Sequence, residues 1–168
     1  MRLLENLFRI VFFRGSPERI LYHRRQFIFS LFAAMAVSAL VQSLVYDEHA
    51  VFVILRVFAE LTMFMLWVVL LTAKVARLRL ASMMMILCLI SVAVDLTTLI
   101  LGVVSPVEWR NALGFAIGAL SSYGVANVVG WALRKPLQIG ALHFAGYFVA
   151  VTALDLSFRG LYNIMVGG

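Results

Sequence analysis

Five long apolar runs, separated by short polar connections, account for most of the chain. They cover residues 27–45, 51–73, 79–104, 112–133 and 138–158. About 20 apolar residues are enough for an α-helix to cross the hydrocarbon core of a bilayer, and a helix satisfies its own backbone hydrogen bonds. The pattern therefore predicts an all-α polytopic membrane helical bundle, in which residues 16–168 form one domain with five transmembrane helices.

The segment before the first run has a different pattern. Over residues 1–15, polar positions that include several arginines recur every three or four residues among leucine, isoleucine and phenylalanine. This spacing is typical of a basic amphipathic helix that lies in the membrane interface. Gly15 ends the pattern, and Ser16 with Pro17 favours a new helix start. We expect an interfacial amphipathic helix over residues 1–15 and a second helix that runs from Pro17 into the first span.

The composition supports the membrane assignment. Hydrophobic residues make up 64% of the 168 residues, and charged residues make up only 13%. A soluble domain of this size cannot bury so many apolar side chains. The lipid bilayer is therefore the first expected partner.

The net charge of +6 follows the predicted topology rather than a nucleic-acid surface. Six of the 14 lysines and arginines precede the first apolar run, and most of the others lie near residues 74–79 and 134–135. Loops rich in lysine and arginine stay on the cytoplasmic side of a membrane. We expect a cytoplasmic N-terminus, a C-terminus on the outer side and no nucleic-acid partner.

Small residues occur at regular spacing in the fourth run. Five of them lie four residues apart and form one ridge of the predicted helix: Gly114, Gly118, Ser122, Ala126 and Gly130. In lipid, hydrophobicity does not draw helices together, and small side chains allow their backbones to approach closely. We expect this helix-packing ridge to place the fourth helix at the centre of the bundle or at a contact between protomers.

Polar residues form stripes on two other runs. The first run carries Ser30, Ser38 and Gln42 on one face, and the third carries Ser91, Asp95 and Thr98 on one face. A polar side chain that faced lipid would lack a hydrogen-bond partner, whereas across a helix interface it stabilises by about 0.6 to 2 kcal/mol. These stripes are expected to face other helices.

Full charges lie inside the second, third and fifth runs. Arg56 and Glu60 are one helical turn apart, Asp95 lies at a similar expected depth, and Asp155 is followed by Arg159 at the same one-turn spacing. A charge at the centre of a bilayer costs roughly 2.5 to 3.5 kcal/mol on insertion scales, so these groups need compensation. We predict an intramembrane charged cluster of these five residues. It could fix helix register, relay protons or ions, or contact another subunit.

Residues that would indicate catalysis or metal binding do not form a recognisable pattern. The chain has one cysteine, Cys88, and three histidines that are far apart in sequence. His143 is expected near the cytoplasmic end of its helix, whereas Cys88 and Ser91 lie at mid-depth, so no base is within reach of a nucleophile. No phosphate-binding or dinucleotide-binding loop occurs. We expect no enzymatic activity, no cofactor and no metal.

The cytoplasmic entry "FFRGSPERILYHRR", the five runs with short loops and the later segment "WALRKPLQIGALHFAGYFV" together give the chain a family profile. In these features it resembles the small bacterial members of the Yip1-like family of polytopic membrane proteins. The resemblance implies a role in membrane organisation or trafficking without chemistry, and a location in the bacterial inner membrane. It transfers no functional residue.

The sequence thus predicts a non-enzymatic integral membrane protein that acts as an accessory subunit or assembly factor. It would act through helix–helix contacts with other membrane proteins, or with copies of itself. The alternative is a small proton- or ion-coupled transporter or channel that works as an oligomer. All three prolines lie at the ends of runs, so the broken helices common in transporters are not indicated.

Overall fold

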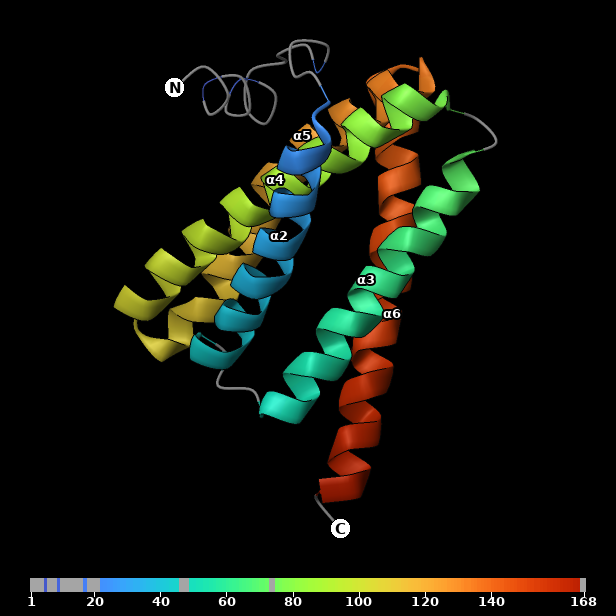
Figure 1. Ribbon diagram of the computed structural model, residues 1–168. Coiled ribbons are helices and arrows are strands. Elements are labelled where there is room, and N and C mark those ends of the chain that lie inside the picture. Colours follow the sequence, from blue (N-terminus) through green and yellow to red (C-terminus); the bar gives the residue numbers. More distant parts are fainter. Residues whose placement is uncertain are drawn as a thin grey trace.

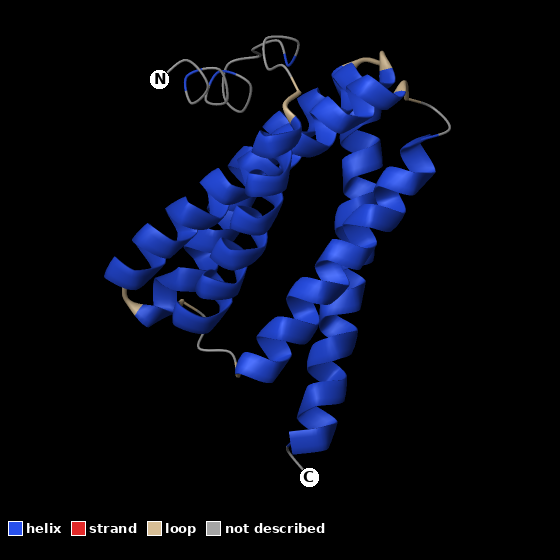
Figure 2. Cartoon of the chain, viewed as in Figure 1, coloured by secondary structure: helices blue, strands red, loops and turns tan. Residues whose placement is uncertain are grey.

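The computed structural model describes residues 22–45, 49–72 and 75–166, together with Glu5, Arg9 and Pro17. In these residues the secondary structure is α-helical (Figure 2), and each long helix is long and apolar enough to cross a membrane. The helices are α2 (Arg24–Leu44), α3 (Ala50–Thr72), α4 (Arg77–Val104), α5 (Val107–Leu133) and α6 (Leu137–Val166). The predicted all-α fold with five membrane-spanning helices is therefore confirmed.

The predicted interfacial helix over residues 1–15 lies outside the described residues, apart from two positions. Glu5 and Arg9 are both helical, and Arg9 Nη2 lies 2.9 Å from Glu5 Oε1.

The expectation of a helix that continues from Pro17 into the first span is wrong. The backbone is extended at His23, with φ −128° and ψ 120°, and α2 begins only at Arg24.

Proline sets two of the helix boundaries. Pro106, with φ −55° and ψ 147°, immediately precedes α5, which begins at Val107 rather than at the predicted residue 112. Ser105 before it is extended, as the residue before a proline prefers, and this ends α4. After α5, Arg134 adopts a left-handed conformation with φ 56°, and its N–H bonds the carbonyl oxygens of Gly130 and Trp131.

The helices form two groups, which Figure 1 shows from the side. In one group α4 packs against both α2 and α5, and in the other α3 lies beside α6. The two groups are close where α5 connects to α6 and spread apart toward the C-terminal end of α6. The bundle is therefore less tightly packed toward the C-terminal end of α6 than at the end where α5 connects to α6.

The hydrophobic core lies at the end where the groups meet. Its fully buried members come from α3, α4 and α5: Leu71, Met83, Met85, Ile86, Val128 and Val129. Two methionines in this core fill irregular space between helices, as the flexible thioether side chain readily does. The tightest packing is thus at the end that carries the α3–α4 and α5–α6 connections.

The crossing of α5 and α6 depends on glycine. A Cβ atom placed on Gly140 would collide with the carbonyl oxygen of Ala126 and would lie 2.6 Å from the backbone nitrogen of Gly130. The two backbones are therefore in direct contact, without intervening side chains. Such close approach is the usual effect of small residues in membrane helices.

Large apolar side chains cover the outer faces of both groups. Phe29 is 75% exposed, Leu70 is 72% exposed and Phe115 is 78% exposed. Contiguous apolar surface on this scale is rare in soluble proteins. In a bilayer these side chains contact lipid tails, and the five helices mark the chain as an integral membrane protein.

Candidate functional site

Arg56 is the centre of the charged cluster. It lies on α3, one turn before Glu60, and its Nε is 3.1 Å from Glu60 Oε1. Spacing of four residues places two side chains on the same helix face, so this contact follows from the local sequence. The Arg56 and Glu60 side chains are 19% and 32% exposed, so both point into the bundle rather than out of it.

The same guanidinium also ties two helices together. Arg56 Nε lies 2.9 Å from Oδ1 of Asp155 on α6, and the Asp155 side chain is 20% exposed. A partly buried ion pair of this kind keeps its geometry only while both partners are present. Arg56 therefore connects α3 to α6 in the part of the bundle where the two helix groups have spread apart.

Asp95 is held differently from the other two acids. It lies on α4, and the Ser91 hydroxyl donates to its Oδ2 at 3.3 Å. Within the described part of the chain, Asp95 forms no ion pair, although it borders the same cavity as Arg56 and Glu60. The structure thus brings Glu60 and Asp155 into contact with Arg56 and places Asp95 in the wall of the cavity that Arg56 and Glu60 also line.

We call this cavity the polar chamber. It has a volume of about 250 Å³ and lies between α2, α3, α4 and α5. Its walls are formed by Ser38, Val41, Gln42, Arg56, Glu60, Ser91, Val94, Asp95, Thr98 and Gly114. Several residues of the two predicted polar stripes therefore line one cavity together with the charges.

Gln42 is the most deeply buried polar side chain of the polar chamber. It is 4% exposed. Its Nε2 donates to Ser38 Oγ at 3.4 Å, while its buried Oε1 has no hydrogen-bond partner. A buried acceptor without a donor is costly, and such atoms in native structures call for an explanation.

The remaining members of the polar stripes bond within their own helices. Ser30 is buried and donates to the carbonyl oxygen of Phe27 at 2.8 Å, and Thr98 is buried and donates to that of Val94 at 3.0 Å. Back-bonding of this kind satisfies a hydroxyl without a second helix. These two side chains face inward as the stripes predict, but the bonds that they make do not cross between helices.

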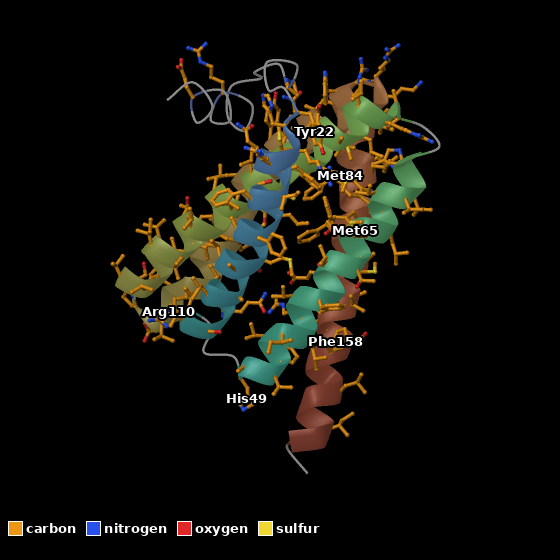
Figure 3. The ribbon with its side chains drawn as sticks, in the orientation of Figure 1. Tyr22, His49, Met65, Met84, Arg110 and Phe158 are labelled. Atoms are coloured by element: carbon orange, nitrogen blue, oxygen red, sulfur yellow. The ribbon has the colours of Figure 1, made fainter. Side chains whose placement is uncertain are left out.

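A second cavity, the aromatic chamber, adjoins the polar chamber. It has a volume of about 350 Å³, and the two share Ser38, Glu60, Ser91 and Val94 in their walls. Its aromatic side chains come from α3 and α6: Phe64, Trp67, Phe144, Tyr147 and Phe148. Trp67 and Tyr147 stack with ring centroids 4.7 Å apart. Figure 3 shows side chains from both helix groups projecting into the space between them.

Sequence reasoning did not identify this aromatic chamber. The spacing of Phe64 with Trp67, and of Phe144 with Tyr147 and Phe148, places each set on one helix face. This spacing predicts an aromatic face on each helix. It does not show whether that face packs against another helix or borders a cavity. Arg110, labelled in Figure 3, precedes the predicted fourth run, but in the structure it belongs to α5 and its Nη1 donates to the Val45 carbonyl oxygen at 3.1 Å.

The helix-packing ridge of α5 is divided. Ala126 and Gly130 are buried against α6, whereas Gly114 and Ser122 are half-buried and Gly118 is exposed. A Cβ atom on Gly118 would meet no other atom within 4 Å. Only the second half of the predicted ridge is therefore packed against another helix, while Gly114 borders the polar chamber and Gly118 borders the aromatic chamber. Arg159 lies on α6 one turn after Asp155, and its side chain is not among those described.

The described residues do not include a group of three or more histidine, cysteine, aspartate or glutamate side chains that could hold a metal ion. Cys88 is buried at the aromatic chamber, and the described part of the chain gives it no histidine neighbour in that wall. The arrangement can hold charge and accept hydrogen bonds inside a membrane.

The chain was compared with protein-family models, with curated proteins and with solved structures, and no significant match was found. Its class therefore rests on the five apolar helices themselves, which define an integral membrane protein.

Proposed function

We propose that this protein is a non-enzymatic accessory subunit or assembly factor that binds another integral membrane protein through the first half of α5 (residues 107–120). The observation that carries the proposal is the contrast between the two halves of this helix. None of residues 107–120 is buried, while every buried residue of α5 lies within residues 121–133.

The composition of this half favours a helix as its partner. Ala112, Ala116 and Ala119 are small and exposed, and Phe115 is 78% exposed beside them. Small residues permit the close backbone approach through which membrane helices associate, and the Gly140 crossing shows the second half of the ridge used in that way. The first half of α5 offers the same kind of surface without a helix from this chain against it.

The charged cluster supports this role as a structural lock. The ion pair between Arg56 and Asp155 holds α6 beside α3. Because α6 is held there, it does not follow α5 along the full length of the ridge (Figure 1). The lock therefore keeps the first half of α5 open for a partner helix.

Site-specific photocrosslinking in the native membrane tests the proposal. A photoreactive phenylalanine analogue replaces Phe115, and the control replaces Leu70, which is similarly exposed at 72% on the outer face of α3. We expect a discrete protein adduct from position 115 and none from position 70. Equal adducts at both positions, or no protein adduct at position 115, would contradict the proposal.

A second candidate function is a small proton- or ion-coupled transporter or channel that works as an oligomer. Glu60 and Asp95 favour it, since both border the polar chamber and acids inside a membrane often serve as relay groups. In this case Glu60→Gln or Asp95→Asn abolishes ion flux into proteoliposomes and leaves assembly intact. Unchanged flux in both variants excludes a relay through these acids.

We also propose an orientation in the membrane, a cellular location and a family for this protein. The distribution of lysine and arginine supports a cytoplasmic N-terminus and a C-terminus on the outer side. A bacterial inner-membrane location and membership of the Yip1-like family rest on the sequence resemblance alone.

A further inference from the structure

We propose that the polar and aromatic chambers together form a binding site for a lipophilic cation, whose charged group pairs with Asp95 and whose apolar body lies in the aromatic chamber. This site goes beyond the helix contact proposed above and does not depend on it. The argument rests on charge, on an unsatisfied acceptor and on the volume of the two chambers.

The charges around the polar chamber do not balance. Among the described residues that line it, Arg56 supplies one positive charge, while Glu60 and Asp95 supply two carboxylates. Arg56 contacts Glu60, whereas the hydrogen-bond donor to Asp95 is the neutral Ser91 hydroxyl. A charge inside a membrane is tolerated when it is paired or reaches a water-filled cavity. A cation in the polar chamber would supply the missing charge.

Gln42 gives an independent indication of a ligand. Its side chain is 4% exposed, it borders the polar chamber, and its Oε1 has no hydrogen-bond partner. Buried acceptors are nearly always satisfied in native proteins. An ammonium group in the polar chamber would bring a hydrogen-bond donor to the wall that contains Gln42 Oε1. A tetra-substituted cation has no such donor and would instead place positive charge near this oxygen.

The aromatic chamber suits the apolar body of the same ligand. Its volume of about 350 Å³ falls in the range of about 300 to 1,000 Å³ that is usual for small-molecule sites. The faces of Trp67, Tyr147 and neighbouring phenylalanines attract cations as well as apolar groups. Because Glu60 and Ser91 line both chambers, a single amphiphilic molecule can occupy both.

Equilibrium binding to the full-length purified protein in lipid nanodiscs tests the inference. The probe is radiolabelled tetraphenylphosphonium, with tetraphenylborate as an anion of the same shape, and empty nanodiscs give the lipid background. We expect saturable binding of the phosphonium and none of the borate. The absence of saturable phosphonium binding, or equal binding of both ions, would overturn the inference.

Variants locate the site. Asp95→Asn keeps the shape of the side chain and removes its charge, and we expect it to weaken phosphonium binding about tenfold or more, as the loss of a paired charge predicts. The matched control is Glu108→Gln, which removes an exposed acid at the start of α5 and should leave affinity unchanged. Equal affinity of Asp95→Asn and wild type would place the cation elsewhere and refute the assignment.

A third variant covers the case in which Asp95→Asn does not fold. Ala34→Leu adds volume to the wall of the aromatic chamber without changing any charge. We expect weaker phosphonium binding and unchanged thermal unfolding, and unchanged affinity would overturn the proposed position of the apolar body. Because this test uses the isolated protein, it can fail while the photocrosslinking test succeeds, and the reverse also holds.

Discussion

At the scale of single residues, Arg56 determines how charge is accommodated inside the bundle. One guanidinium contacts carboxylates on its own helix and on α6, at 3.1 Å and 2.9 Å. Arginine suits this role because it stays charged and presents several donors in a fixed plane. Its removal takes away the cation that contacts both Glu60 and Asp155.

We predict that Arg56→Gln destabilises the folded protein by about 3 to 5 kcal/mol, the usual cost of breaking a buried pair from one side. Combining it with Asp155→Asn should recover a large part of the loss, because the carboxylate on α6 that Arg56 contacted is then neutral as well. Reversible unfolding in mixed detergent micelles, followed by tryptophan fluorescence, measures both changes.

The control for this prediction is Arg134→Gln, which removes an exposed arginine at the end of α5. It should change the free energy of unfolding little. If Arg56→Gln were as mild as this control, the cluster would not act as a lock between α3 and α6.

Part of this cluster was predictable from the sequence, and part was not. Spacing of four residues was enough to pair Arg56 with Glu60. The same rule suggested Arg159 as a neighbour of Asp155, and this pairing stays a prediction because the Arg159 side chain is not among those described. The structure also places Arg56, from another helix, beside Asp155. Contacts between helices depend on their rotation and separation, which local spacing does not determine.

At the scale of secondary-structure elements, glycine positions decide where helices can touch. Gly140 lies against the backbone of α5, while Gly146 on the same helix has no atom within 4 Å of a Cβ placed on it. We predict that Gly140→Ala destabilises the protein by about 1 to 3 kcal/mol or more through overpacking. Gly146→Ala should be neutral or stabilising by about 0.5 to 1 kcal/mol, as expected for helix propensity.

Thermal unfolding of the two alanine variants in the same detergent measures this difference. Both substitutions add one methyl group to α6, so the comparison isolates the effect of the crossing. Equal stability of the two variants would show that α5 and α6 do not meet at Gly140.

The elements also show which features an apolar pattern can predict. The length of each run predicted five helices and their order, because crossing a bilayer requires a fixed length. The pattern underestimated α6, which continues to Val166, since a helix can extend past the apolar run that defines it. Four-residue spacing identified the ridge on α5 but not how far α6 follows it, because the course of a neighbouring helix is not encoded in that spacing.

At the scale of the whole molecule, the topology is testable without a purified protein. The sequence predicts that the connections after α3 and α5 face the cytoplasm and that the C-terminus lies outside. A C-terminal alkaline phosphatase fusion should therefore be active in a bacterial host, and a C-terminal green fluorescent protein should be dark. The opposite pattern would invert the predicted orientation.

The whole molecule also leaves open the surface where a partner is proposed, since none of residues 107–120 is buried. Ala119 offers a sensitive position there, because it is exposed and lies one turn after Phe115 on the same helix face. Ala119→Leu should thus leave folding intact while it blocks close approach of another helix. The variant therefore distinguishes a loss of assembly from a loss of folding.

Native mass spectrometry of the tagged protein, extracted from its own membranes in a mild detergent, tests the central claim most directly. The account predicts a second membrane protein in fixed stoichiometry with the wild type, and its loss from the Ala119→Leu variant while that variant stays folded. Wild-type protein that appears only as a monomer or as a homo-oligomer, or a complex that survives Ala119→Leu unchanged, would contradict it.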